Sequence, residues 1–135
     1  MPFDFVSSDQ RAVQRQKAGR GLVSHLKGLA GEDSVVSAYL SEGYQLLERR
    51  WRGKAGEIDL IFAFDATVVF VEVKASASFG QAAGNLSPHQ IGVISRAIDE
   101  YLDRLPTGTL TEIRFDLAMV DAVGRIDILE NALAG

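Results

Sequence analysis

The sequence predicts an α/β domain in which a central mixed β-sheet is flanked by α-helices. Apolar residues recur at helical spacings in two separate segments, and strand-like segments lie between and after them. Two of these strands are joined by so few residues that they form a hairpin. A chain of 135 residues is long enough for one substantial core and too short for two ordinary ones. We therefore expect one functional site.

The first predicted helix spans about residues 22–42. Its apolar residues recur at spacings of three and four, the helical period; they are Leu22, Leu26, Leu29, Val35, Val36, Tyr39 and Leu40. Gly43 follows in the position where a glycine commonly ends a helix. Residues 1–18 are polar and lack this periodicity. We expect them to form a mobile N-terminal arm, followed by a single domain over residues 19–135.

Three strands are predicted after this helix. Residues 44–50 form a short extended segment, and residues 57–64 and 67–74 form two longer segments. The two longer segments are separated only by Asp65 and Ala66. Adjacent strands with so short a connection pair as a hairpin.

A second predicted helix begins at Ser87 and Pro88, which supply an N-cap and a first-turn proline. It follows a loop rich in Gly, Ala and Ser at about residues 75–85. Pro106 and Gly108 end it. Its buried stripe consists of Ile91, Ile94, Ile98, Tyr101, Leu102 and Leu105.

Residues 113–120 alternate apolar side chains with others and predict a further strand. Arg114 and Asp116 share one face of this strand and are expected to pair with each other or with a neighbour. Residues 126–129 add a last short strand after a turn at Gly124. The order helix, strand, hairpin, helix, strand predicts one mixed sheet with helices packed on it.

The composition narrows the kinds of site that the chain can carry. It has no cysteine, which excludes disulfide scaffolds, thiolate zinc sites and cysteine nucleophiles. Its histidines are His25 and His89, so a bound metal would be a hard cation held by oxygen, such as Mg²⁺ or Mn²⁺. No apolar stretch approaches the roughly 20 residues that span a bilayer, and no signal-peptide pattern opens the chain. We therefore expect a cytoplasmic protein without a membrane partner.

The charge distribution leaves two readings open. The formal net charge is −4, which does not suggest a protein that coats nucleic acid. Basic residues nevertheless form two clusters, which are Arg11, Arg15, Lys17 and Arg20, and then Arg49, Arg50, Arg52 and Lys54. Such clusters either track phosphates locally or are solvated surface charge.

Two acids lie inside strands that are otherwise apolar. If the hairpin loop holds two or four residues, Phe64 faces Thr67 and Asp59 sits directly opposite Glu72. Residues two apart in a strand share a face, so Lys74 points to the same side as Glu72. Opposed carboxylates repel each other and disfavour folding, so this arrangement is a poor choice for stability alone.

A bound divalent cation would reverse that repulsion. It would take oxygen from Asp59, Glu72 and the backbone carbonyl of Val73, with waters in its remaining positions. Lys74 is placed to orient or deprotonate one of those waters, or to stabilise charge on a phosphorane. The alternative is a salt bridge of Lys74 with Glu72 or Asp59 that needs no metal.

Three further residues can be interpreted either as part of the functional site or as structural residues. Glu32 borders the buried stripe of the first helix, where it is a metal ligand, a ligand through water, or an early-turn acid. Gln90 either contacts a substrate phosphate or orders a water, or it is a surface residue on the flank of the second helix. Trp51 either stacks on a base or is a buried strand residue, the commoner case.

Several stretches of the chain resemble the YraN family. They are Gly31-Glu32, Gly43-Tyr44, Arg50-Trp51-Arg52, Gly56-Glu57-Ile58-Asp59-Leu60-Ile61, Phe70-Val71-Glu72-Val73-Lys74, Arg114-Phe115-Asp116 and Asn131-Ala132. The resemblance covers about Arg20 to the C-terminus. The family is placed with the Holliday-junction-resolvase-like branch of the PD-(D/E)XK nuclease superfamily, which implies a restriction-endonuclease-like core.

The resemblance implies a role for each matching residue. Asp59 matches the metal-binding aspartate of the superfamily, Glu72 its second acid and Lys74 its lysine, while Glu32 matches the glutamate of the first helix. The family often has a lysine at the start of the second helix, where this chain has His89-Gln90.

The sequence thus predicts a Mg²⁺- or Mn²⁺-dependent endonuclease acting on DNA, with branched or damaged DNA as candidate substrates. The catalytic set is Glu32, Asp59, Glu72 and Lys74, and the residues expected to approach nucleic acid are Arg49, Arg50, Arg52, Lys54 and Gln90. The alternative is a nucleic-acid-binding or adaptor module of a repair or recombination complex that keeps the nuclease fold without turnover. A homodimer is expected by analogy alone.

Overall fold

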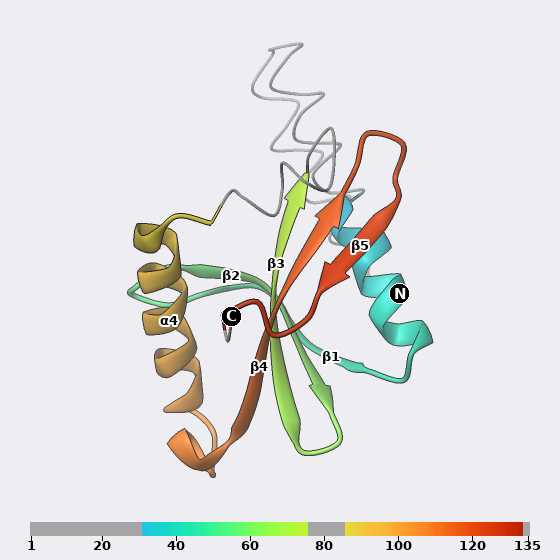
Figure 1. Cartoon of the computed structure of the whole chain (residues 1–135). Coiled ribbons are helices and arrows are strands. Elements are labelled where there is room, and N and C mark those ends of the chain that lie inside the picture. Colours follow the sequence, from blue (N-terminus) through green and yellow to red (C-terminus); the bar gives the residue numbers. More distant parts are fainter. Residues whose placement is uncertain (1–30, 76–85, 134–135) are drawn as a thin grey trace, which may run out of the picture.

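The computed structural model describes residues 31–75 and 86–133. Within these residues, five strands form one sheet in the order β1-β2-β3-β4-β5 (Figure 1). Their bounds are β1 Gln45–Arg52, β2 Glu57–Phe64, β3 Thr67–Ala75, β4 Glu112–Val120 and β5 Ile126–Leu129. Strands β3 and β4 run parallel, and the other neighbours run antiparallel. The sheet is therefore mixed, as predicted.

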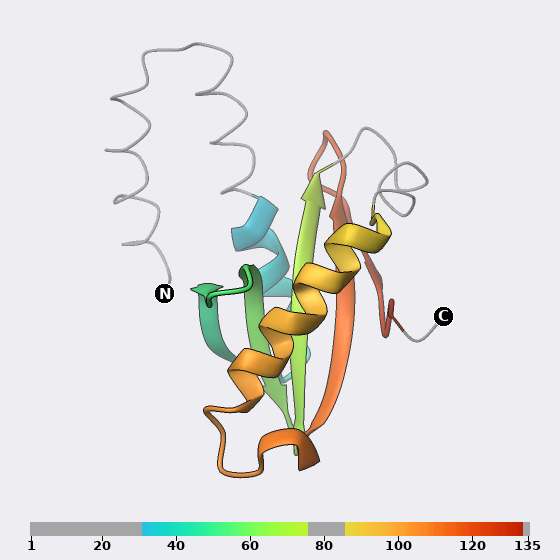
Figure 2. The same cartoon turned by 90° about the vertical axis from the view of Figure 1, so that its left-hand side faces the viewer.

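Helices cover both faces of the sheet (Figures 1 and 2). Helix α4 (Pro88–Leu102) lies on one face, and the helical residues 31–41 lie on the other. A short 3₁₀ helix, η1 (Gly108–Leu110), precedes β4. The predicted first helix is confirmed from residue 31 to residue 41, whereas its earlier part and the predicted N-terminal arm lie outside the described residues.

The core consists of two apolar layers separated by the sheet. The layer under α4 contains the residues Trp51, Ile58, Ile61, Val68, Phe70, Ile94, Ala97, Ile98, Tyr101, Leu102 and Phe115. The layer under residues 31–41 contains Val35, Val36, Tyr39, Leu60, Phe62, Val69, Val71, Ala118 and Val120. Each large apolar side chain removed from water contributes roughly 1.5–3 kcal/mol. The central strands are apolar on both faces because both faces are covered.

Helix α4 starts where the sequence predicts. Ser87 is the N-cap, its side chain accepts from the backbone N–H of Gln90, and the Gln90 side chain accepts from the backbone N–H of Ser87. This capping box satisfies two N–H groups that the helix leaves unpaired. The helix ends at Leu102, three residues before the predicted stripe does, but Leu105 still packs against the same core.

The β2–β3 hairpin has the predicted register over its paired rows. The pairs run from Phe64↔Thr67 to Leu60↔Val71. Asp65 occupies the turn with φ 52°, a left-handed conformation that Asp tolerates better than most residues. The next pair would be Asp59↔Glu72, but the pairing ends before it. The backbones of β2 and β3 are therefore not paired at the positions of the two acids.

Three antiparallel strands, a helix and a fourth strand parallel to the third make up the α/β architecture. The predicted α/β class, a central mixed sheet flanked by helices, is confirmed. Among the described residues, no helix is both long enough and apolar enough to cross a membrane.

Candidate functional site

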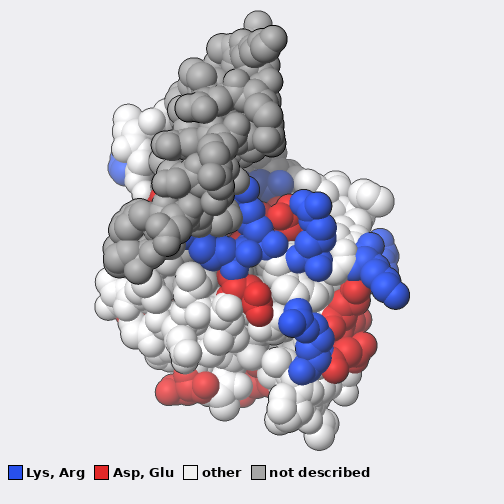
Figure 3. Space-filling model, turned by 180° about the vertical axis from the view of Figure 1, so that it is seen from behind, with Lys and Arg blue, Asp and Glu red and all other residues white. Residues whose placement is uncertain are grey.

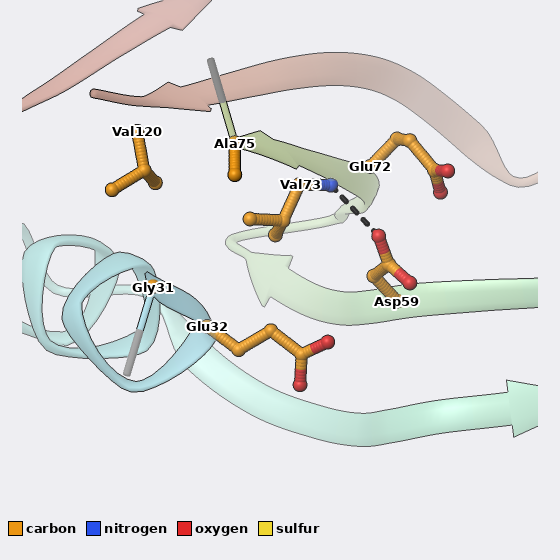
Figure 4. A pocket seen from close by; sticks show the side chains of 7 residues that line it. All are labelled: Gly31, Glu32, Asp59, Glu72, Val73, Ala75 and Val120. Atoms are coloured by element: carbon orange, nitrogen blue, oxygen red, sulfur yellow. Dashed lines mark hydrogen bonds between the residues drawn. The ribbon is translucent and has the colours of Figure 1, made fainter. Parts of the chain in front are cut away.

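A pocket of about 260 Å³ opens at the end of the paired part of β2 and β3. The residues that line it are Gly31, Glu32, Asp59, Glu72, Val73, Ala75 and Val120 (Figure 4). They come from the start of the described helix and from three neighbouring strands. Three of the four acidic and basic residues predicted to be catalytic therefore share one cavity.

Asp59 occupies the point where β2 leaves β3. Its neighbours Ile58 and Leu60 pack in opposite core layers, although residues two apart in a regular strand share a face. The strand alternation is thus interrupted at Asp59. Its Oδ2 accepts a hydrogen bond of 2.8 Å from the backbone N–H of Val73 (Figure 4). This side-chain contact takes the place of the missing ladder bond and fixes the carboxylate beside β3.

Glu72 and Lys74 lie together on the next strand. Phe70 packs under α4 whereas Val73 packs in the other layer, so alternation places Glu72 and Lys74 on the α4 face. Lys74 Nζ lies 3.8 Å from Glu72 Oε2, and both side chains are largely buried. The salt bridge that the sequence left as an alternative is present, and it sits directly beside the pocket.

Glu32 enters the pocket from the helix, on the side of Asp59 that faces away from Glu72 (Figure 4). It is buried although it is charged, with 8% of its surface exposed. Arg50 Nε lies 3.3 Å from Glu32 Oε1, and Arg49 Nη2 lies 4.0 Å from the same oxygen. Asp33 accepts a hydrogen bond of 2.7 Å from Arg49. Two arginines of β1 thus hold two acids of the helix.

Burial makes negative charge unfavourable in this pocket. It raises the pKa of Glu72 to about 8, with the charge of Asp59 adding to the rise and that of Lys74 opposing it. It also raises the pKa of Asp59, against the lowering effect of the Val73 N–H. Burial raises the pKa of Glu32 as well, and Arg50 opposes this. A cation in the pocket would stabilise the ionised form of all three acids.

The residues expected to approach nucleic acid fall into different environments. Arg49 is buried in its contacts with Asp33, whereas the side chain of Arg52 is 78% exposed and lies 3.8 Å from Glu57. Lys54 is exposed in the β1–β2 turn. On the side of the molecule opposite to Figure 1, Lys and Arg side chains gather beside acidic ones (Figure 3).

Two other candidates have structural roles. Gln90 forms the capping box of α4, which fits its reading as a helix-flank residue. Trp51 is buried, with 9% of its surface exposed, and packs edge-to-face on Tyr101 at a centroid distance of 5.3 Å. The reading of Trp51 as a buried strand residue is confirmed, and its ring is not available to stack on a base.

Sequence reasoning missed several residues of the site. Asp33 follows Glu32 and holds Arg49, but a single acid on a predicted helix is too common to single out. Ala75 and Val120 line the pocket because β3 and β4 are parallel neighbours, with Ala75 paired to Val120. Nothing in the sequence distinguishes small apolar residues that line a pocket from those in the core.

The donor set of the pocket suits a hard cation. It offers the carboxylates of Asp59 and Glu72 beside the backbone of Val73, with no sulfur or imidazole among the described residues that line it. Within residues 31–75 and 86–133, no group of three or more His, Cys, Asp or Glu side chains is arranged to hold a metal ion. An ion at this place would therefore have two carboxylate ligands, as Mg²⁺ often has when waters and substrate phosphates complete its shell.

Comparison with known proteins identifies close relatives. The family model described as "Uncharacterised protein family UPF0102" matches residues 31–120. A UPF0102 protein of Ruegeria pomeroyi is 50% identical over 115 residues, which cover 85% of this chain and 94% of the relative. A UPF0102 protein of Roseobacter denitrificans is 48% identical over 120 residues, covering 89% and 92%. The solved structure titled "Crystal structure of SSO0001" has a TM-score of 0.43 and 19% identity, covering 92% of this chain and 58% of that one.

Proposed function

This chain belongs to the uncharacterised family UPF0102, the YraN family related to PD-(D/E)XK nucleases, and we propose that it is a divalent-metal-dependent endonuclease acting on DNA. One observation carries the proposal. Asp59 and Glu72 line one pocket, and burial raises the pKa of both carboxyl groups, so a bound cation there would favour their ionised forms. Two neighbouring carboxyl groups with raised pKa values lower the stability of the fold, and such groups are typical of functional sites.

The ligands of the metal would be the carboxylates of Asp59 and Glu72 and the backbone carbonyl of Val73. Mg²⁺ or Mn²⁺ bound there would supply a Lewis acid for the phosphodiester and lower the pKa of a water. The hydrogen bond from the Val73 N–H holds Asp59 in place before any ligand arrives. Such preorganisation avoids reorganisation of the site during the reaction.

Lys74 would act on the water and on the phosphate. Its ammonium group lies on the same strand face as Glu72 and only 3.8 Å from that carboxylate. At this place it can orient the attacking water, accept its proton when neutral, or stabilise negative charge that develops on phosphorus-bound oxygens. Glu32 supports the site from the helix side of Asp59.

The proposed substrate is DNA, with branched or damaged DNA as candidates. Arg50, Arg52 and Lys54 lie in and just after β1, next to the strand that carries Asp59. Basic residues at that place can contact phosphates on either side of the bond that is cut. A role in repair or recombination and a homodimer remain proposals by family analogy.

The proposal is tested by incubating the purified chain with Mg²⁺ or Mn²⁺ and labelled single-stranded, duplex, flap and four-way-junction DNAs. The variants are Asp59→Asn, which removes a ligand charge with little change in shape, and Lys74→Met, which removes the ammonium group. Asp127→Asn changes an exposed acid of β5 and serves as the matched control. We expect cutting by the wild type and the control, and a loss of at least 100-fold in both site variants.

Binding without cutting has a different meaning. If the wild type cuts none of these DNAs but shifts some of them in a gel, the adaptor or binding module becomes the better reading. If Asp59→Asn cuts as fast as the wild type, the assignment of the metal site is wrong.

A further inference from the structure

Two neighbouring arginines of β1 point to the same side of the strand. Arg49 contacts Asp33 and Arg50 contacts Glu32, whereas Trp51 packs on the other side under α4. Successive residues of a regular strand alternate between faces. The exception is explained by Arg50, which has φ 51° in the left-handed region. That conformation is costly for a residue other than Gly and is often found where a side chain has a functional direction.

The two arginines differ in how deeply their side chains are buried. The Arg49 side chain is only 9% exposed and lies 2.7 Å from Asp33, so it is fixed inside the protein. The Arg50 side chain is 28% exposed and reaches Glu32 through Nε at 3.3 Å, a long contact for a charged pair. Arg50 is therefore the arginine that can change partner without leaving a fully buried charge behind.

Arg50 also stands next to the candidate metal site. The pairs Arg49↔Leu60 and Trp51↔Ile58 flank it, which puts Arg50 in register with Asp59 on the next strand. Its partner Glu32 lines the same pocket as Asp59 (Figure 4). The Glu32 carboxylate is thus paired with Arg50 at the border of the pocket. The Arg50 side chain itself is partly exposed there.

We infer that Arg50 exchanges Glu32 for a phosphate of the nucleic acid, and that Glu32 then turns to the metal site of Asp59 and Glu72. The inference rests on the proposed function and adds to it a coupling between phosphate binding and metal binding. A guanidinium group forms two parallel hydrogen bonds with a phosphate, which is a better geometry than its present contact through Nε. Arg50 is thus a positioning residue for Glu32 and a direct contact of the substrate.

The first test is Mn²⁺ binding to the full chain without nucleic acid, followed by electron paramagnetic resonance of the free ion. Arg50→Asn removes the guanidinium group and introduces a residue type that adopts the left-handed backbone more readily. Because Glu32 loses its contact with Arg50 and keeps the longer one of 4.0 Å with Arg49, we expect Mn²⁺ affinity to rise about 5- to 10-fold, in the usual range for two coupled sites. Equal or lower affinity overturns the inference. A wild type that binds no Mn²⁺ overturns the proposed function as well.

The same substitution in a Glu32→Gln variant distinguishes the release of Glu32 from a simple loss of positive charge. In Glu32→Gln, the added change Arg50→Asn should alter Mn²⁺ affinity less than about twofold, because no carboxylate is left to release. An equal rise with and without Glu32 means that charge alone acts, and overturns the inference. Arg96→Asn removes an exposed arginine of α4 and should leave Mn²⁺ affinity unchanged.

The third measurement is fluorescence anisotropy of the DNAs named above, with Ca²⁺ in place of Mg²⁺ and at several salt concentrations. Arg50→Asn should weaken binding and lower the slope of log K against log salt by about 0.7–0.9, the value of one phosphate contact. A purely structural defect would lower the affinities for metal and DNA together, so a rise in one and a fall in the other is specific to the exchange. Unchanged DNA binding, or none in the wild type, overturns the inference.

Discussion

At the scale of single residues, the pocket works against the stability of the metal-free protein. Glu72 is held beside Asp59 in a buried place, and burial with the nearby negative charge raises the pKa of Glu72 to about 8. Lys74 offsets this only in part. A fully apolar pair at these two positions would avoid the repulsion. The acids are therefore best understood as prepared for a positive ligand.

This predicts a pH dependence of stability in the absence of metal. The pKa of Glu72 is higher in the folded chain than its ordinary 4.5, so the folded state binds the proton more tightly than the unfolded state. The contribution of Glu72 is therefore constant below about pH 4.5 and becomes more unfavourable as the pH rises to about 8. Because each pKa unit corresponds to about 1.4 kcal/mol, the wild type should lose on the order of 5 kcal/mol over this interval relative to Glu72→Gln.

The measurement is urea unfolding in EDTA at a series of pH values. Asp127→Asn, on an exposed position of β5, controls for the loss of any acid. Parallel stability curves for the wild type and Glu72→Gln would contradict the prediction.

At the scale of secondary structure, α4 fixes the β1–β2 turn that follows the basic strand. The Glu100 carboxylate accepts hydrogen bonds from the backbone N–H groups of Lys54 at 2.8 Å and Ala55 at 2.6 Å. These bonds lower the pKa of Glu100. A Cβ on Gly53 would lie 2.7 Å from Trp51 Cη2, so the turn approaches its neighbours too closely for a larger residue. The exposed Lys54 is thus carried on an anchored turn.

The anchor predicts local effects of Glu100→Ala. The amides of Lys54 and Ala55 lose their acceptor, so their hydrogen exchange should accelerate by about 10-fold or more while the core amides of β2 and β3 change little. Two-dimensional NMR of the exchanging protein measures both sets at once. Arg96→Ala, on the same helix, is the control. Unchanged exchange at Lys54 and Ala55 would show that the turn is held by other contacts.

The elements were predictable because their signals are local. Alternation gives the strands, Ser87 and Pro88 give the start of α4, and the two-residue gap gives the hairpin register from Phe64 to Leu60. The capping box was also readable, since a Gln follows three residues after the N-cap Ser.

The geometry of the site was less predictable because it depends on departures from regularity. Asp59 does not pair across the ladder with Glu72 but accepts from the Val73 N–H. Arg50 adopts a left-handed backbone that nothing in an Arg-Arg-Trp-Arg segment announces. Arg114 and Asp116 pair as expected, yet Asp116 also accepts from Tyr39, 77 positions away in the chain. Only the fold brings such partners together.

At the scale of the whole molecule, the topology assembles the pocket from distant parts of the chain. The helix contributes Glu32, β2 contributes Asp59, and β3 contributes Glu72, with β4 closing one side through Val120. In the unfolded chain these groups are far apart, so a preformed site exists only in the folded state. A metal that binds there must stabilise the fold by mass action.

Mg²⁺ should therefore raise the melting temperature through Asp59. At ten times its dissociation constant, a ligand specific to the folded state adds about 1.4 kcal/mol, which corresponds to a rise of roughly 3–8 °C for a domain of this size. Asp59→Asn removes one ligand charge and should abolish the rise, although the variant itself is no less stable without metal because a buried repulsion is gone. Differential scanning fluorimetry with Mg²⁺, and with NaCl at equal ionic strength, measures the effect. An equal rise in the wild type and Asp59→Asn would mean that the ion acts as a general salt, because a site on the sheet requires Asp59.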